Sequence, residues 1–370
     1  MASLLAPSAA AAQGQIFGRV TGTLEEVFDD NLFAAPVNLP RQSDVITRFG
    51  PAVEVGYRSL PLALLARYGF DAERYRTLHD LDDTFARQEG TAGLNYRSRR
   101  LALNLAGSYL ETQTPSELNI ESLLVVGRAQ AERIAAKSGL SYEMSALTSV
   151  NMGYEFTSDG LAGGIDSTTH LLRAGIGRKV GSLHAIRGDY EYRDIDFSDG
   201  TGEKSYVVTG GWTHGFTRSI SFQLDAGVRN TTGDIDPEIS ALLRRRLRRG
   251  DISVGYLRTQ ETTIGESGSV DVRRLTATVT YTPTRSFEIT ASPSRALSIA
   301  ADWHAVVHGL DMESRLRVTR RWSVSALGRI GEQDRTFDGR DETVPFRSIS
   351  VRTLVTLGTL ERESREDGTQ

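Results

Sequence analysis

The sequence predicts an all-β fold: a transmembrane antiparallel up-and-down β-barrel of about 18 strands, within a range of 16–18. Three observations predict it. Apolar and polar residues alternate with a period of two along most of the chain. Short polar turns alternate with longer polar connections, as in a meander with two unlike ends. No run of 18 or more apolar residues is present, which excludes a helical membrane span.

The composition agrees with this fold class and excludes several functions. The 370 residues include 43 Lys and Arg against 47 Asp and Glu, so the net charge of −4 gives no sign of a nucleic-acid partner. The chain has no cysteine, which excludes disulfides, thiolate catalysis and cysteine-based metal sites. With 36 glycines and only 10 prolines, the balance favours many strands joined by tight turns.

The two ends of the chain are predicted to lie outside the barrel. Residues 1–13, MASLLAPSAAAAQ, resemble the small-residue end of a secretory signal, and the alternative is a disordered Ala-rich N-terminus. Residues 14–361 form one barrel domain in this prediction, and residues 362–370 form a polar periplasmic tail. Export to a compartment beyond the inner membrane follows from the first segment.

The alternation itself defines two-faced strands. In Ile220–Arg229 nearly every apolar side chain falls on one face and every charged one on the other, and the same pattern occurs in Leu101–Tyr109, Ser149–Phe156 and Leu275–Tyr281. Such strands are expected to run for about nine to eleven residues, which suits a tilted crossing of a bilayer. A sheet of this kind must bury its apolar face, and lipid can cover it where no helix does.

The connections predict the topology. Short turns are expected at 58–61, 97–100, 145–147, 180–182, 215–218, 248–251, 282–285 and 320–321. Longer segments are expected at 29–44, 71–83, 112–119, 158–166, 194–203, 231–238, 263–269 and 335–343, with one more at 292–300. This order places the short turns and both termini in the periplasm and the long segments outside the cell.

The polar face is predicted to line a wet lumen, because so many charges do not fit a dry core. A soluble β-sandwich or propeller, the alternative, would show short strands and turns at blade periods, and the sequence shows neither. The arginines assigned to the lumen, as candidate contacts for a polymer, are Arg67, Arg87, Arg173, Arg187, Arg193, Arg229, Arg244, Arg246, Arg248 and Arg329.

No cofactor or metal is predicted. His304 and His308 have the i, i+4 spacing of zinc helices, but the glutamate of that motif is missing and the context is strand-like. The glycines of Gly175–Gly181 miss the dinucleotide-binding spacing and lead into a turn. The sequence therefore predicts no metal site and no nucleotide site.

No catalytic residue is predicted either, and the protein is expected not to be an enzyme. The G-x-S-x-G motif of hydrolases is absent. An outer-membrane hydrolase stays open as a less favoured alternative, with Ser205, His214 and Asn230 as its possible parts.

Several short motifs resemble a known family. They are Asp29-Asp30-Asn31-Leu32-Phe33 after the first strand, the turns Phe216-Thr217-Arg218-Ser219, Thr284-Arg285-Ser286 and Val318-Thr319-Arg320, and the strand ends Gly56-Tyr57 and Gly153-Tyr154-Glu155. Together they resemble the β-barrel porin family (beta-barrel porin 2-like) of exopolysaccharide biosynthesis and export operons in Gram-negative bacteria. The resemblance implies an outer-membrane conduit without catalytic residues.

The function expected from sequence is a passive outer-membrane channel for a secreted, anionic exopolysaccharide. Arg244, Arg246 and Arg248 lie near a predicted periplasmic turn, where they would concentrate such a polymer rather than bind nucleic acid. The expected partners are outer-membrane lipid and lipopolysaccharide, the polysaccharide, and a periplasmic export protein. Three alternatives remain: a general small-solute porin, the hydrolase, and a scaffold whose lumen is blocked by an inserted loop.

Overall fold

The computed structural model describes residues 14–337 and 339–363, and most of this chain is β-strand. Two short 3₁₀ turns, η1 (His79–Leu81) and η2 (Pro115–Glu117), lie in connections. The strands are β1 (Gln15–Asp29), β2 (Asp44–Arg58), β3 (Leu62–Tyr75), β4 (Asp83–Arg97), β5 (Leu101–Thr112), β6 (Ala131–Glu143), β7 (Thr148–Leu161), β8 (Ser167–Lys179), β9 (His184–Phe197), β10 (Gly202–Gly215), β11 (Ile220–Thr231), β12 (Asp234–Leu247), β13 (Gly250–Thr262), β14 (Ser269–Thr284), β15 (Phe287–Ile299), β16 (Trp303–Arg317), β17 (Trp322–Phe337) and β18 (Arg340–Glu363).

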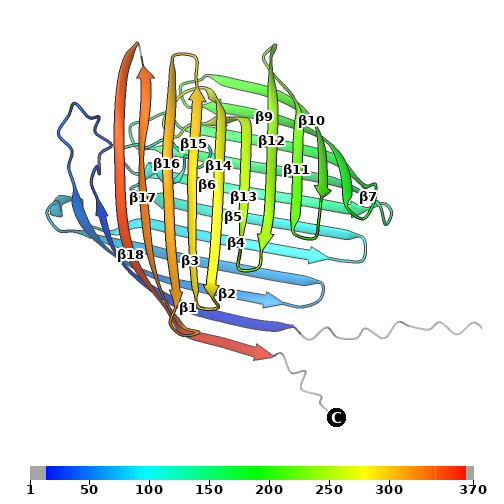
Figure 1. Ribbon diagram of the computed structural model, residues 1–370, viewed down its shortest axis with the longest axis horizontal. Helices are drawn as coiled ribbons and strands as arrows, with labels where there is room; N and C mark the ends of the chain where they lie inside the picture. The colour runs from blue at the N-terminus through cyan, green and yellow to red at the C-terminus, as the bar shows by residue number, and fades with distance from the viewer. Residues whose placement is uncertain (1–13, 338, 364–370) are drawn as a thin grey trace, which may run out of the picture.

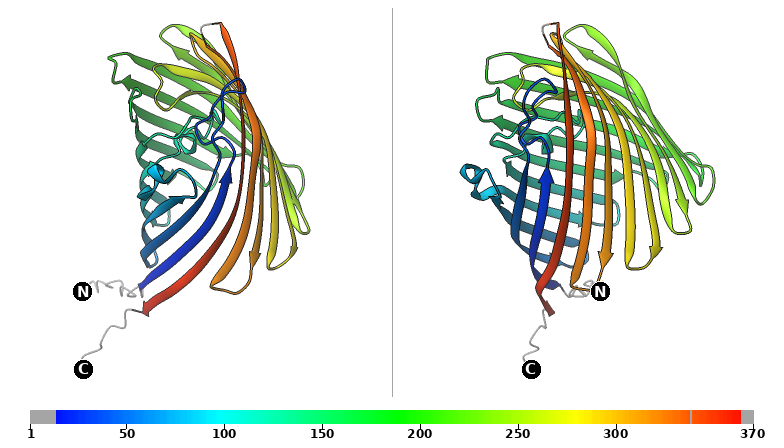
Figure 2. Two further views of the ribbon diagram at one scale, coloured as in Figure 1. Left: turned by 90° about the vertical axis from the view of Figure 1, so that its left-hand side faces the viewer. Right: turned by 60° about the vertical axis from the view of Figure 1, so that its left-hand side comes forward.

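The sheet closes on itself (Figure 1). Each strand pairs antiparallel with the next, and β1 pairs with β18 from Gln15↔Glu363 to Asp29↔Ser348. Each described strand thus has a hydrogen-bonded neighbour on both sides, which is what a barrel needs within lipid. The predicted antiparallel barrel of about 18 strands is thus confirmed, and β1 begins at the same end where β18 finishes (Figure 2).

Short turns occupy the end at which β1 begins and β18 finishes, which we call the short-turn end. They lie within about three residues of their predicted positions, which is within the usual uncertainty of strand boundaries. Four opposite connections are long: 30–43, 76–82, 113–130 and 263–268.

Four of the predicted long segments are wrong. β12 begins directly after a turn at 232–233, and β18 begins at Arg340, shortly after β17 ends at Phe337, so most of 231–238 and 335–343 is strand. Most of 194–203 is strand as well, since β9 and β10 are joined by 198–201. The segment 292–300 lies almost entirely in β15, and the actual connection is 300–302. Polar residues in these hairpins do not mark the end of a strand, because an antiparallel pair keeps its ladder where its side chains are polar.

The strands are also longer than predicted. Seventeen of them span 12–16 residues and β18 spans 24, against an expected nine to eleven. About ten residues suffice to cross the apolar band, so the remainder of each strand projects into the aqueous phase.

The outward face is apolar and uncovered. Leu105, Met152, Val228 and Leu275 point outward and are 39%, 56%, 54% and 51% exposed. Apolar area of this extent needs lipid or a partner to cover it. Among the described residues, no helix is both long enough and apolar enough to span a bilayer.

Gly250, which begins β13 after the turn at 248–249, provides a test of the fold. Its φ is 149°, and a Cβ there would lie 1.9 Å from the carbonyl oxygen of Thr280. We expect Gly250→Ala to lower the free energy of unfolding by about 2 kcal/mol, because both the backbone and β14 must shift. Urea unfolding, followed by the mobility of the folded barrel in unheated detergent gels, measures this. The control is Gly139→Ala, where the Cβ meets no atom within 4 Å; equal midpoints would contradict the prediction.

Candidate functional site in the barrel lumen

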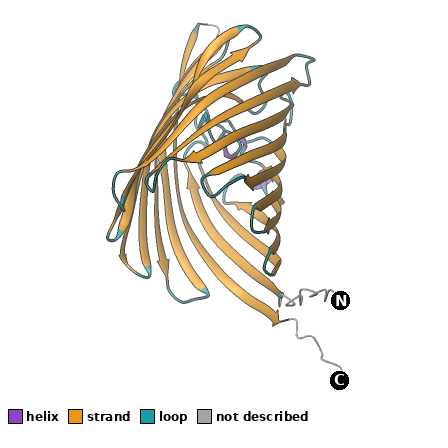
Figure 3. Cartoon of the chain, turned by 90° about the vertical axis from the view of Figure 1, so that its right-hand side faces the viewer, coloured by secondary structure: helices purple, strands orange, loops and turns teal. Residues whose placement is uncertain are grey.

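The connection between β5 and β6, residues 113–130, enters the barrel interior, and we call it the crossing segment. Leu124 belongs to a buried cluster with Val270 and Val272 of β14, Trp303 of β16 and Phe346 of β18. In the ring of 18 strands, β14 lies nine positions from β5, directly opposite it. The segment therefore spans the interior from one wall to the other, inside the ring of strands (Figure 3).

Polar contacts fix the far side of the crossing segment. The side-chain oxygen of Gln333 on β17 accepts a hydrogen bond from the backbone N–H of Val125 at 2.8 Å. Arg274 on β14 donates to the carbonyl oxygen of Ile120 at 2.7 Å and forms an ion pair with Glu121 at 2.8 Å. Backbone groups inside a barrel need such partners, so the segment has a defined position.

The near side of the crossing segment is tied to the wall close to its origin. Arg87 on β4 donates to Glu117 at 2.9 Å, and Arg128 forms an ion pair with Glu73 on β3. Both ends and the centre of the segment are therefore attached, and it acts as a fixed partition rather than a free loop.

A second element also folds inward, on the side of β10–β12. The pairing of β12 with β13 stops at Ile239↔Arg258, so residues 259–262 pair only with β14. The connection that follows, 263–268, reaches β7–β8, where Gly265 pairs with Ile165. We call β13 and β14 from residue 259 to residue 272 the inner hairpin.

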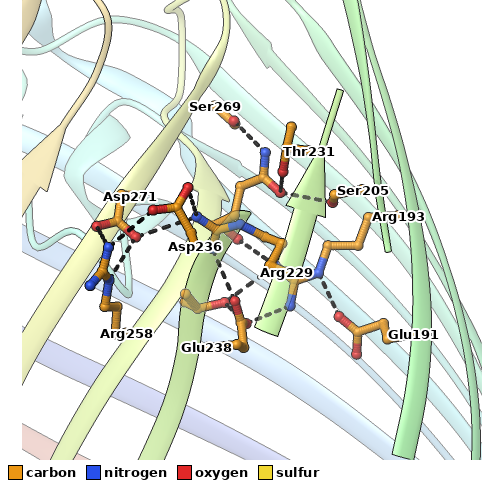
Figure 4. A network of polar contacts seen from close by, with 12 residues as sticks. Glu191, Arg193, Ser205, Arg229, Thr231, Asp236, Glu238, Arg258, Ser269 and Asp271 are labelled. Carbon is orange, nitrogen blue, oxygen red and sulfur yellow. Dashed lines mark hydrogen bonds and ion pairs between the residues drawn. The ribbon is translucent and has the colours of Figure 1, made fainter. Parts of the chain in front are cut away.

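An ionic network fills the space between the inner hairpin and the barrel wall (Figure 4). Arg229 on β11 is 3% exposed and donates to Glu238 at 2.9 Å and to Asp271 at 3.4 Å. Arg193 on β9 donates to the same Glu238 at 2.8 Å and to Glu191. Buried charges persist only when paired and hydrogen-bonded, so this network holds the inner hairpin in place.

The tip of the inner hairpin has one further attachment, outside the membrane-spanning strands. Ser267 donates to the carboxylate of Asp199 in the β9–β10 connection at 2.6 Å. Hydrogen bonds from Ser267 and Thr201 hold the pKa of Asp199 below its usual value of 3.8. Because this folded-state pKa is lowered, the contact is complete above pH 3.8 and is lost only as the pH falls through the lowered pKa.

The crossing segment separates two cavities. The larger, about 750 Å³, lies between residues 118–122 of the segment and strands β6–β13, and we call it the main cavity. The smaller, about 410 Å³, lies against β1–β4 and β18, with Glu117 of the segment in its wall, and we call it the side cavity. Both sizes fall in the range of small-molecule sites.

The predicted arginines divide between these cavities and other places. Arg173, Arg187 and Arg193 line the main cavity, and Arg67 and Arg87 line the side cavity. The guanidinium of Arg67 has no hydrogen bond or ion pair with another described residue, whereas those of the other four are each paired with carboxylates. Their location in the interior follows the alternation, but their pairing does not.

The remaining predicted arginines lie elsewhere. Arg229 is buried in the ionic network rather than open to the lumen, so it differs from the expected polymer contact because three carboxylates enclose it. Arg244 pairs with Asp251 at 3.3 Å near the short-turn end, and Arg248 lies in the turn itself. Arg246 lies opposite Asp251 in the ladder, and the guanidinium of Arg329 covers the ring of Phe346.

The residues considered for metal binding and hydrolysis are not brought together. Along a strand, His304 and His308 are about 13 Å apart, and both lie in β16. Ser205 bonds to Gln260 in the interior, whereas His214 stacks on His184 on the outer face. In the described part of the chain, no group of three or more His, Asp and Glu side chains is arranged to hold a metal ion.

Sequence reasoning missed the crossing segment, which was assigned only to 112–119. One signal for it was available: residues 123–126 are Leu-Leu-Val-Val, an apolar run without the alternation of a barrel strand. The alternation places carboxylates such as Glu191 and Asp225 on the same face as the lumen arginines, but it does not predict which of them pair, because most partners come from different strands.

The closed 18-stranded ring with an apolar exterior is the architecture of a bacterial outer-membrane β-barrel. The short-turn end is accordingly the periplasmic end. No family model matches the sequence, and no curated protein matches it.

Solved structures do match the fold. Acinetobacter baumannii OccAB4 aligns with a TM-score of 0.52 and 8% identity, over 95% of this chain and 99% of that one. Pseudomonas aeruginosa OccK2 (OpdF), in complex with glucuronate, aligns with a TM-score of 0.51 and 10% identity, over 92% of this chain and 98% of that one. P. aeruginosa OpdQ aligns with a TM-score of 0.50 and 11% identity, over 95% of this chain and 98% of that one. At these identities the likeness concerns the fold.

Proposed function

We propose that the protein is a non-enzymatic outer-membrane channel for small polar solutes. The observation that carries the proposal is the crossing segment, which is fixed to opposite walls and divides the interior into cavities of about 750 and 410 Å³. Spaces of this size fit single small molecules, and their charged walls suit polar ones.

The polysaccharide conduit expected from sequence is the competing proposal, and the crossing segment argues against it. A secreted polymer needs a continuous wide path with weak, repeated contacts. Here the crossing segment, held by Gln333, Arg274 and Arg87, lies across that path. The likeness to OccK2, whose structure contains glucuronate, supports solutes the size of one sugar unit.

The size limit of permeation tests this function. We expect proteoliposomes containing the protein to swell in arabinose and glucose, more slowly in a disaccharide, and not at all in a long-chain dextran. Planar bilayers should show single-channel currents in KCl. Heat-denatured protein is the control. Absence of both swelling and current would indicate a plugged scaffold, and passage of the dextran would favour the polymer conduit.

A further inference from the structure

The main cavity has more acidic than basic side chains, in contrast to the arginine-rich lumen expected from sequence. Eight carboxylates and six cationic side chains line it. Every one of the six cations is already in an ion pair with a carboxylate of the described chain, for example Arg133 with Asp159 at 2.6 Å and Arg187 with Asp225 at 2.6 Å. The arginines therefore offer little free positive charge to a solute.

Glu261 is the exception among the carboxylates of this cavity. It lies on β13 in the inner hairpin, is partly buried and lines the cavity. The other seven are all ion-paired, whereas the side chain of Glu261 has no hydrogen bond or ion pair with another described residue. A partly desolvated carboxylate that is neither hydrogen-bonded nor in an ion pair costs free energy, and a cation that enters the cavity relieves this cost.

The rest of the wall suits the body of a small polar solute. Thr157, Thr209, Gln223 and Ser240 face the same space and supply neutral donors and acceptors. A primary ammonium group has three donors and no acceptor, so it matches one free carboxylate surrounded by hydroxyl and amide groups.

We propose that the main cavity binds small primary amines and that Glu261 accepts the ammonium group. The proposal rests on the proposed role of the lumen as a solute path, and it specifies the solute class. The proposed solute is cationic, whereas the polymer expected from sequence is anionic. The cation pairs with the carboxylate that the protein leaves free, while the paired arginines keep the cavity from attracting anions.

The test compares 1,4-diaminobutane with uncharged 1,4-butanediol. Calorimetry on the detergent-solubilised barrel measures binding without any need for conduction, and block of single-channel current measures it in a bilayer. We expect the diamine, and not the diol, to bind wild type, and Glu261→Gln to weaken binding at least about tenfold.

Two further variants distinguish binding at Glu261 from a general attraction of the diamine to acidic side chains. Glu155→Gln removes a carboxylate of the same cavity that Lys137 already pairs with at 2.5 Å, and Glu332→Gln removes one on the outer face of β17. Both should change diamine affinity far less than Glu261→Gln. Equal affinity of wild type and Glu261→Gln, or equal losses in Glu261→Gln and Glu155→Gln, would overturn the proposal. Diamine binding without current would support the site while refuting the channel.

Discussion

Removal of the crossing segment is expected to raise single-channel conductance several-fold and to admit larger solutes. The variant replaces residues 115–127 with a short Gly-Ser linker between β5 and β6. The expected gain arises because the segment lies between the two cavities, and its loss merges them into one wide lumen. Bilayer conductance and the swelling rate in a disaccharide measure the effect.

A milder variant guards against misfolding of the deletion. Arg274→Ala combined with Gln333→Ala removes the polar anchors of Ile120, Glu121 and Val125 but retains the chain. It should give larger and noisier currents than wild type. Arg295→Ala, an exposed arginine on β15, is the control and should conduct like wild type. If folded deletion protein conducts no more than wild type, the segment is not the constriction.

The second large effect is expected at Glu238. Arg193 and Arg229 both donate to this one carboxylate, at 2.8 and 2.9 Å. Glu238→Ala leaves two largely buried guanidinium groups without a major partner, so we expect a loss of about 3–5 kcal/mol in the free energy of unfolding. Urea unfolding measures it.

Paired substitutions show whether the lower free energy of unfolding comes from the guanidinium groups left without a carboxylate partner. Combining Glu238→Ala with Arg229→Met should recover part of the lost stability, because one uncompensated cation is removed as well. Glu313→Ala is the matched control: Glu313 pairs with Arg315 at 2.7 Å on an exposed part of β16. Glu313→Ala should lower the free energy of unfolding by less than about 1 kcal/mol. A similar cost at both sites would show that the network contributes no more than a surface pair.

The faces of the barrel could be predicted because a strand places neighbouring side chains on opposite sides. In Ile220–Arg229 this rule alone assigns Val228 to lipid and Asp225 to the interior, and the structure agrees. Strand number followed from the turns. The ends of the long hairpins could not be located, since strands that leave the bilayer lose the apolar signal but keep their pairing.

The interior could not be predicted in the same way. Whether an arginine is free or neutralised depends on residues from other strands: Arg67 is free and Arg187 is paired with Asp225, 38 positions along the chain. Free Glu261 was not a candidate at all, because an unpaired carboxylate and a paired one look alike in sequence.

The alternation in the sequence is enough to predict a closed antiparallel wall with one face for lipid and one for water, because a period of two is a local property of each strand. What occupies the enclosed space depends on tertiary contacts. The packing of Leu124 against Phe346 and the inward turn of β13 beyond Arg258 are contacts between distant segments, and no local pattern encodes them. Those contacts set the size and the charge of the path that a solute meets.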